Sequence, residues 1–304
     1  MGPSVRARYL TPVPLVSTPA VILHVMPYGD TSKILRLLTR DLGLQSAIAR
    51  GARRPHSPTG PRLDLFAFGT ASLRMRERRE LSPLTGFEAG DSHAALAHDI
   101  GRFSAASALA ELALKCAPAE AHPQVFDAVA GGLQALAEAA EADVGAVALA
   151  ACWAVVVALG FSPALDRCAV CGTPVDGATH FSAALGGALC GSHRSGAGSV
   201  AKLTAKDREA LAALVGGLLP EPPLDDRHAA AHRRLLFSFI RHHLAEYRPL
   251  PAMAFWDKEG QHLVAIPSDC ASDAYRRQGA QASSRVSELW RMGPGTPGAG
   301  HTPR

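Results

Sequence analysis

AVILHVMPYGDTSKILRLLTRDLGLQSAIARGARRP, residues 20–55, is the stretch that decides the N-terminal fold. Its apolar runs are short and rich in Val, Ile and Leu. They are broken by Pro-Tyr-Gly-Asp and Asp-Leu-Gly, which are typical turn sequences. Two further runs follow a loop rich in Gly, Pro and Arg. The five predicted strands are 21–25, 33–40, 44–50, 65–75 and 81–87.

Five short strands within about seventy residues are typical of a small barrel of the OB type. An SH3-like barrel fits the pattern nearly as well. Alternation in the second strand places Leu35 and Leu37 on one face and Arg36 on the other. OB barrels often use aromatic side chains to stack on bases. The aromatic residues available here are Tyr28, Phe66, Phe68 and Phe87, and we expect a core role for the three phenylalanines.

The positive charge of the chain is concentrated in this N-terminal segment. Residues 1–90 contain 13 Lys and Arg against 6 Asp and Glu, whereas the rest contains 18 against 21. Such an uneven distribution is typical of a nucleic-acid surface, although a basic face also serves membranes, protein partners or solubility alone. The candidate DNA contacts are Lys33, Arg36, Arg40, Arg50, Arg53, Arg54, Arg74, Arg76, Arg78 and Arg79.

The remainder of the chain has a helical pattern. Apolar residues spaced by three and four form the stripes Ala105, Leu109, Leu112, Cys116 and Val125, Val129, Leu133, Leu136. Asp143, Thr204 and either Asp225 or Asp226 are predicted helix caps, the Thr204 helix running through Leu219 and the last helix to about Tyr247. A hairpin is predicted over 253–266, followed by a tail rich in Gly and Pro.

The predicted organisation is therefore α+β and multidomain. An OB-type barrel at 19–90 follows a flexible N-terminus at 1–18. The helical domain at 91–250 carries a zinc-knuckle insertion at about 166–196, and residues 251–304 form a largely disordered extension. A length of 304 residues and 47% hydrophobic residues suit two globular domains.

One segment is apolar enough to be considered as a membrane-spanning helix. Residues 144–165 contain no charged side chain, but Gly160 and Ser162-Pro163 should end a helix there. The remaining 144–159 is short for a spanning helix, so we interpret it as a buried core helix. No secretory signal is visible, which predicts a reducing, cytoplasmic location with no membrane association.

In that setting, paired cysteines indicate a metal site rather than disulfides. Cys168-x2-Cys171 and Cys190-x2-His193 form two close pairs with ligand types that suit tetrahedral Zn²⁺. Four protein ligands predict a closed, structural site. Two alternatives stay open: His180 could replace His193, or the cysteines could simply pack.

Taken together, these features resemble the RecO family of bacterial recombination mediators. The resemblance covers about residues 19–248 and rests on the order of several short motifs. They are 20–23, 27–30, 39–43, 49–54 and 80–85, followed by 159–161 and 163–172 at the entry to the zinc knuckle. Family members with zinc often have four cysteines, whereas His193 stands in the fourth place here.

The resemblance implies a non-enzymatic protein of bacterial DNA repair and recombination. It would bind single- and double-stranded DNA and anneal complementary strands at the nucleoid. With RecR it would help RecA replace single-strand-binding protein (SSB), whose acidic C-terminal tail it would contact. Two other functions fit parts of the pattern. In a zinc-ribbon transcription or RNA-binding factor the knuckle would read nucleic acid, helped by Arg167 and Arg194. A zinc hydrolase would need an open metal site and a base such as Asp166 or Asp176.

Overall fold

The computed structural model describes residues 14–75, 81–90, 93–97, 99–195, 197–245 and 248–262. Contacts between residues divide the chain into two compact units. One contains residues 1–93 together with 117–130, and the other contains 94–116 together with 131–304.

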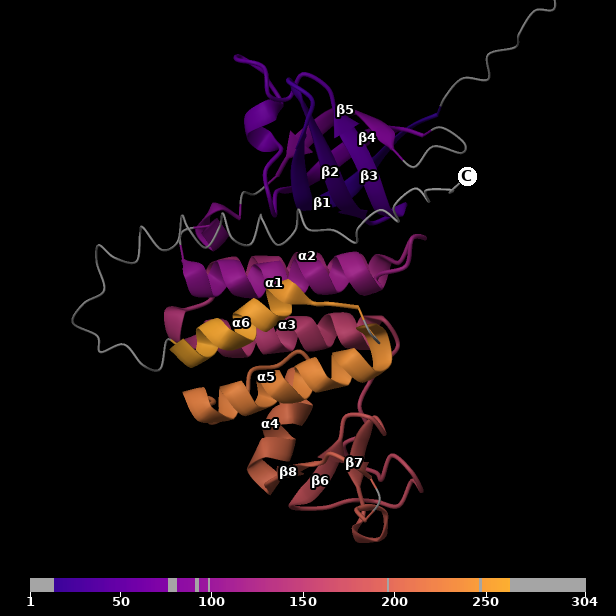
Figure 1. The fold of residues 1–304 in the computed structure, drawn as a ribbon, viewed down its shortest axis with the longest axis vertical. Coiled ribbons are helices and arrows are strands. Elements are labelled where there is room, and N and C mark those ends of the chain that lie inside the picture. The colour runs from indigo at the N-terminus through magenta and orange to yellow at the C-terminus, as the bar shows by residue number, and fades with distance from the viewer. Residues whose placement is uncertain are drawn as a thin grey trace, which may run out of the picture. The chain divides into compact units, whose positions relative to one another are not determined.

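The first unit contains a closed five-stranded barrel (Figure 1). The strands are β1 (Leu15–Tyr28), β2 (Ser32–Thr39), β3 (Gly43–Ala49), β4 (Phe68–Arg74) and β5 (Ser82–Ala89). They pair in the order β1-β2-β3-β5-β4, and β1 also pairs with β4 to close the barrel. β3 and β5 run parallel, whereas the other neighbours are antiparallel. This arrangement confirms the OB-type barrel and excludes the SH3-like alternative.

The predicted alternation is confirmed by burial. Leu35 and Leu37 are fully buried in the barrel core, where Phe87 joins them. Arg36, between the two leucines, is only half-buried. Phe66 is also buried, but it precedes β4 and has a φ of 64°, so the strand predicted over 65–75 began too early.

β1 is longer than predicted because residues 15–18 pair with β4, so they are not the flexible segment expected there. The pairing continues through Pro19, which has no N–H to donate. Because the ladder between β1 and β2 begins only at Ala20, β1 has a ladder on one side at Pro19, the side of β4. A register shift between Ile22 and His24 then lets one long strand curve and pair with two neighbours.

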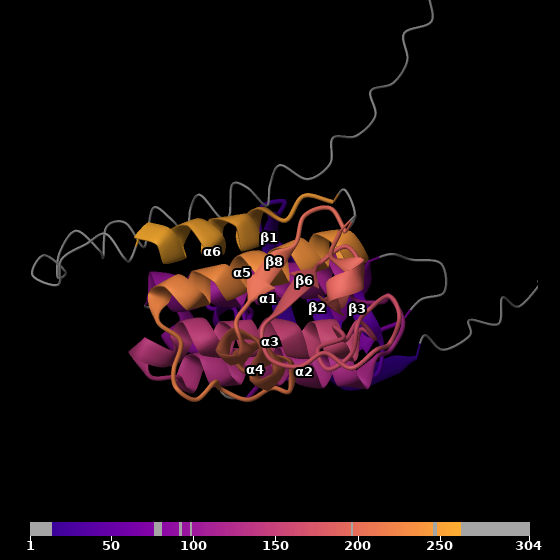
Figure 2. The same ribbon diagram turned by 90° about the horizontal axis from the view of Figure 1, so that it is seen from below.

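The second unit is mostly helical. Its helices are α1 (Ile100–Cys116), α3 (Val144–Ala158), α4 (Ala205–Val215), α5 (Asp226–Ile240) and α6 (Pro251–His262), and α2 (Pro123–Glu138) contributes its second half. α1, α3, α5 and α6 lie side by side, and Figure 2 shows α5 between α6 and α3. Both predicted apolar stripes are buried, apart from the half-buried Cys116.

The predicted caps have different outcomes. Thr204 forms a capping box with Asp207, and the Asp225 side chain accepts a hydrogen bond from the His228 N–H. Asp143 stands at the N-cap of α3 without a side-chain hydrogen bond. α4 ends at Val215, before Gly216, so its predicted end at Leu219 was too late. α5 passes at Ile240 into the π-helical turn Arg241–Ala245, and the predicted end at about Tyr247 lies outside the described residues.

The uncharged segment forms α3. Among the described residues, one helical stretch, Glu141–Ala158, is long and apolar enough to span a membrane by length and composition. α3 buries Trp153 completely, and its ring meets Phe239 of α5 edge-on, with centroids 5.2 Å apart. This packing supports its interpretation as a core helix.

α6 occupies the place where a hairpin was predicted, so that prediction was wrong. Pro251 stands at the first helical position, where no N–H is needed. Glu111 of α1 is fully buried, and its Oε2 accepts a hydrogen bond of 3.0 Å from the Met253 N–H. The start of α6 is therefore capped by a residue far away in sequence.

Glu111 should make stability depend on pH. Burial raises its pKa to about 7, against the opposing hydrogen bonds from Met253 and Ala252. Because the folded state holds this proton more tightly than the unfolded state, stability should fall between about pH 4.5 and pH 7, by about 3 kcal/mol. Glu111→Gln should remove that part of the pH dependence. Urea unfolding of both proteins at pH 5 and pH 8 tests this, and an unchanged pH dependence in the variant would contradict it.

Candidate metal centre and nucleic-acid interface

The cysteine segment folds as a small module between α3 and α4. Its sheet has the order β7-β6-β8, formed by β6 (Thr179–Ser182), β7 (Gly187–Leu189) and β8 (Ala201–Leu203). Cys168 and Cys171 lie in a tight turn closed by the Gly172 N–H to the Cys168 carbonyl. The second pair follows β7, and the His193 N–H donates to the Cys190 carbonyl. Each pair is thus held by its own backbone turn.

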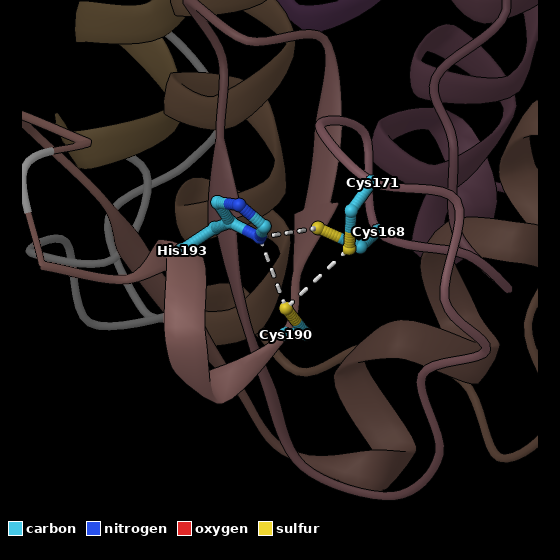
Figure 3. Close-up of side chains that lie close together, drawn as sticks. All are labelled: Cys168, Cys171, Cys190 and His193. Atoms are coloured by element: carbon cyan, nitrogen blue, oxygen red, sulfur yellow. Dashed lines mark hydrogen bonds between the residues drawn. The ribbon is translucent and has the colours of Figure 1, made fainter.

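The two turns bring all four predicted ligands together (Figure 3). Cys171 and Cys190 have their Sγ atoms 3.8 Å apart, and His193 Nδ1 lies 3.8 Å from Cys168 Sγ and 3.2 Å from Cys190 Sγ. A tetrahedron with Zn–S bonds of about 2.3 Å has edges of about 3.8 Å, so the donors suit this ion. His180 lies in β6 and is outside the cluster.

The electrostatics of the site favour the thiolate at Cys168, whereas burial raises the pKa of the Cys190 thiol. Hydrogen bonds from the backbone N–H groups of Cys190 and Cys171 lower the pKa of the Cys168 thiol to about 6. The thiolate is the form that binds metal. The protein core of the module is small, with Cys168, Val175, Ala188 and Leu189 as its buried cluster. A module with so little apolar burial needs additional stabilisation, and a metal can supply it.

Two side chains anchor the module to the helices. Arg208 of α4 donates to the carbonyls of Leu165 and Val175, at 3.4 and 3.1 Å. His243 Nε2 lies 2.7 Å from the Ala183 carbonyl, so this nitrogen donates. The Cys/His cluster is thereby held in a fixed position relative to α4 and α5.

This geometry gives little support to the two alternative functions, a zinc hydrolase and a zinc-ribbon factor. All four tetrahedral positions can be filled by protein side chains, which leaves no place for a catalytic water. Asp166, offered as a base, is 94% exposed and lies 3.8 Å from Arg208. Arg167 donates to the Gly172 carbonyl inside the knuckle. The site therefore has the properties of a structural centre.

The predicted basic residues divide into separate groups, of which the first lies where β3 ends. Arg50, Arg53 and Arg54 are exposed. Gly51 has a φ of 72°, which lets the chain turn immediately after Arg50. The Arg53 N–H donates to the Thr31 carbonyl and its Nη1 to the Gly29 carbonyl, so this turn packs against the β1–β2 turn.

Lys33 stabilises the β3–β4 connection, which carries these arginines. Its Nζ donates to the carbonyls of Gly60 and Leu63, at 3.1 and 2.8 Å, and so fixes the connection between β3 and β4. The same connection exposes Arg62, which sequence reasoning missed although it belongs to the same Arg-rich loop. We call Arg50, Arg53, Arg54 and Arg62 the basic end of the barrel. Asp30 and Asp64 are the acidic residues of these two loops.

The other described candidates lie apart from the basic end. Arg40 is at the opposite end of β3, about 23 Å away at 3.3 Å per residue, and forms two hydrogen bonds with Asp127, at 3.1 and 3.2 Å. Arg36 donates to Ser46 Oγ at 2.7 Å on the outer face of the sheet. Arg74 is exposed at the end of β4, opposite Leu15. Arg76, Arg78 and Arg79 lie outside the described residues.

Two of the three phenylalanines have the expected core role, whereas Phe68 is half-buried. Phe66 and Phe87 are buried, and Phe68 packs against Phe126 with ring centroids 6.3 Å apart. Tyr28 is 54% exposed and precedes Gly29, whose carbonyl holds Arg53. A tyrosine beside the basic end can stack on a base.

Comparison with known proteins decides the family. Residues 13–93 match the family model described as "Recombination protein O N terminal", and residues 97–251 match "Recombination protein O C terminal". The chain belongs to the RecO family. It is 35% identical over 255 residues to the DNA repair protein RecO of Anaeromyxobacter dehalogenans strain 2CP-C, covering 82% of this chain and 98% of that protein.

Similar values hold for other RecO proteins. Identity to the DNA repair protein RecO of Anaeromyxobacter sp. strain K is 34% over 82% of this chain and 99% of that protein. For the protein of the same name from Nocardioides sp. it is 30% over 79% and 98%. Membership of the RecO family supports a role in DNA repair and recombination as a mediator, and no catalytic activity is named for these proteins.

Proposed function

We propose that this RecO-family protein binds single- and double-stranded DNA and anneals complementary strands. With RecR it helps load RecA onto DNA coated with SSB, whose acidic tail it contacts. It acts in the bacterial cytoplasm, at the nucleoid. The observation that carries DNA binding is the basic end, where the β3–β4 connection of an OB-type barrel carries four exposed arginines.

The chemistry follows from phosphate repulsion. Two DNA strands resist approach because both backbones are negatively charged, and a surface that neutralises phosphates lowers this barrier. Arginine contacts to phosphates carry no sequence information, so binding should show weak sequence preference. Tyr28 adds a stacking surface for an unpaired base. The ion pair with Asp127 already occupies the Arg40 guanidinium, so Arg40 is a weaker candidate than the arginines of the basic end.

We propose further that Cys168, Cys171, Cys190 and His193 hold one structural Zn²⁺. The donor distances support this choice of ion. Zinc would stabilise the module and take no part in a chemical step. The domain boundaries at 90 and 250 also stay predictions.

A fluorescence annealing assay tests the function. Complementary oligonucleotides, bare or coated with SSB, are mixed with the full chain, and duplex formation is followed with and without RecR. We expect faster annealing on bare DNA and retained activity on coated DNA. If the protein binds DNA but does not accelerate annealing, it is a DNA-binding protein without annealing activity. If it does not bind DNA even at low salt, the proposal is refuted.

A further inference from the structure

The exposed face of α5 and the first residue of the π-helical turn that follows it carry a regular row of arginines. Arg227, Arg234 and Arg241 follow one another at intervals of seven residues, and all three are exposed. Seven residues are close to two helical turns, so the three lie on one face, with a drift of about 20° at each step. We call these three residues the α5 arginine row.

Small side chains separate the arginines. Ala231 is exposed and Ser238 is half-buried, and by helical periodicity both lie on the same face as the row. The Arg241 guanidinium lies 6.0 Å above the Phe237 ring, which supports it near the end of the helix. An extended ligand could approach the helix closely beside Ala231, whereas the Phe237 ring lies beside Arg241 and limits the approach there.

The opposite face of α5 holds the helix in place. Leu236 and Ile240 are fully buried, and Phe239 packs against Trp153 of α3. This core leaves the arginine row on a helix of fixed position and direction. The backbone positions of the row are therefore evenly spaced, about 10.5 Å apart along the axis and about 21 Å from end to end.

The charges of the row are not neutralised nearby. Within the part of the chain that the structure describes, none of the three arginines forms an ion pair. The nearest acidic residues to Arg227 in sequence are Asp225 and Asp226, and the nearest to Arg241 is Glu246, which lies outside the described residues. Asp225 is bound to His228, at 2.7 Å, and Asp226 lies about 100° around the helix from Arg227.

We propose that the α5 arginine row binds the phosphate backbone of a DNA strand, as a second DNA surface besides the barrel. This inference rests on the proposed function. The row suits a polyanion, because three exposed cations on one face of a rigid helix can each contact a phosphate of the same strand. A protein that pairs two strands needs a place for each, and this surface would hold the second.

The test measures how binding of a labelled oligothymidine to the full chain depends on salt. Arg227→Ala with Arg234→Ala should reduce the slope of log K against log salt by about 1.4, at 0.7 for each lost phosphate contact, and adding Arg241→Ala should bring the reduction to about 2. The matched control is Lys202→Ala with Lys206→Ala, which removes two exposed charges elsewhere in the same unit. Arg227→Lys with Arg234→Lys should keep most of the slope.

The outcomes separate this inference from the proposed function. If the wild type binds and anneals DNA but the α5 variant keeps its full slope, the inference fails and the function stands. Equal loss in the lysine control would also overturn it, because the effect would then be general charge. Weakened binding of an oligoglutamate peptide, with DNA binding unchanged, would assign the row to an acidic protein partner instead. If the wild type does not bind DNA, both the inference and the proposed function fail.

Discussion

Cys171→Ser will unfold the metal module and abolish the binding of one zinc per chain. Serine cannot supply the thiolate, and the buried cluster of the module is too small to hold its two turns together alone. Structural zinc contributes roughly 10–16 kcal/mol of binding free energy in small zinc modules, so the loss of one ligand should be decisive. Metal analysis and limited proteolysis of residues 163–203 measure the two effects.

The matched control for this prediction is Cys152→Ser. Cys152 is fully buried in α3, outside the cluster, so its loss should leave the zinc content at one per chain. Removing zinc from the wild type with a chelator should reproduce the proteolysis pattern of Cys171→Ser. A metal-free protein that binds no zinc on titration would refute the zinc assignment.

Arg53→Glu with Arg54→Glu will slow annealing and flatten the salt dependence of DNA binding. Losing two phosphate contacts reduces the slope by about 1.4 for a single strand, and the two new negative charges repel the backbone in addition. We expect weaker binding to every DNA sequence alike, since these contacts read phosphates. Fluorescence anisotropy over a range of salt concentrations, together with the annealing rate, measures both effects.

Because Arg53 also holds the Gly29 carbonyl, its replacement could disturb the β1–β2 turn. Arg50→Glu with Arg54→Glu avoids this problem and should give the same loss. A control with Arg53→Lys and Arg54→Lys keeps the charge and should keep most of the slope. If both glutamate variants bind DNA normally, the DNA surface of the barrel lies elsewhere.

Much of the barrel could be predicted from sequence because its signals are local. Alternation around Leu35 and Leu37 and the turns at 27–30 and 41–43 identify the strands directly. The N-terminal part of β1 was missed because Pro14 and Pro19 look like strand breakers. Only the pairing with β4 shows that Pro19 lies where the absence of its N–H costs little stability. The start of α6 depends on Glu111, which is 142 residues from Met253, so no local pattern reveals it.

The Cys/His cluster was predictable for a similar reason: each pair is close in sequence, so only the meeting of the two pairs required the fold. The basic candidates were less predictable, because an arginine in a sequence carries no sign of its partner. Asp127 pairs with Arg40 across 87 residues, and only the structure separates this arginine from the basic end. Arg62 was passed over because it stands outside the dense run at 50–54.

The hold of Lys33 on the β3–β4 connection has a kinetic consequence. Its ammonium ties two carbonyls of that connection to β2 before any ligand arrives. The loop that carries Arg62 is thus preorganised, and little conformational entropy remains to be lost on association. Encounter with a polyanion should then be governed by diffusion and long-range attraction, and a fast on-rate that falls steeply with ionic strength is the expected signature.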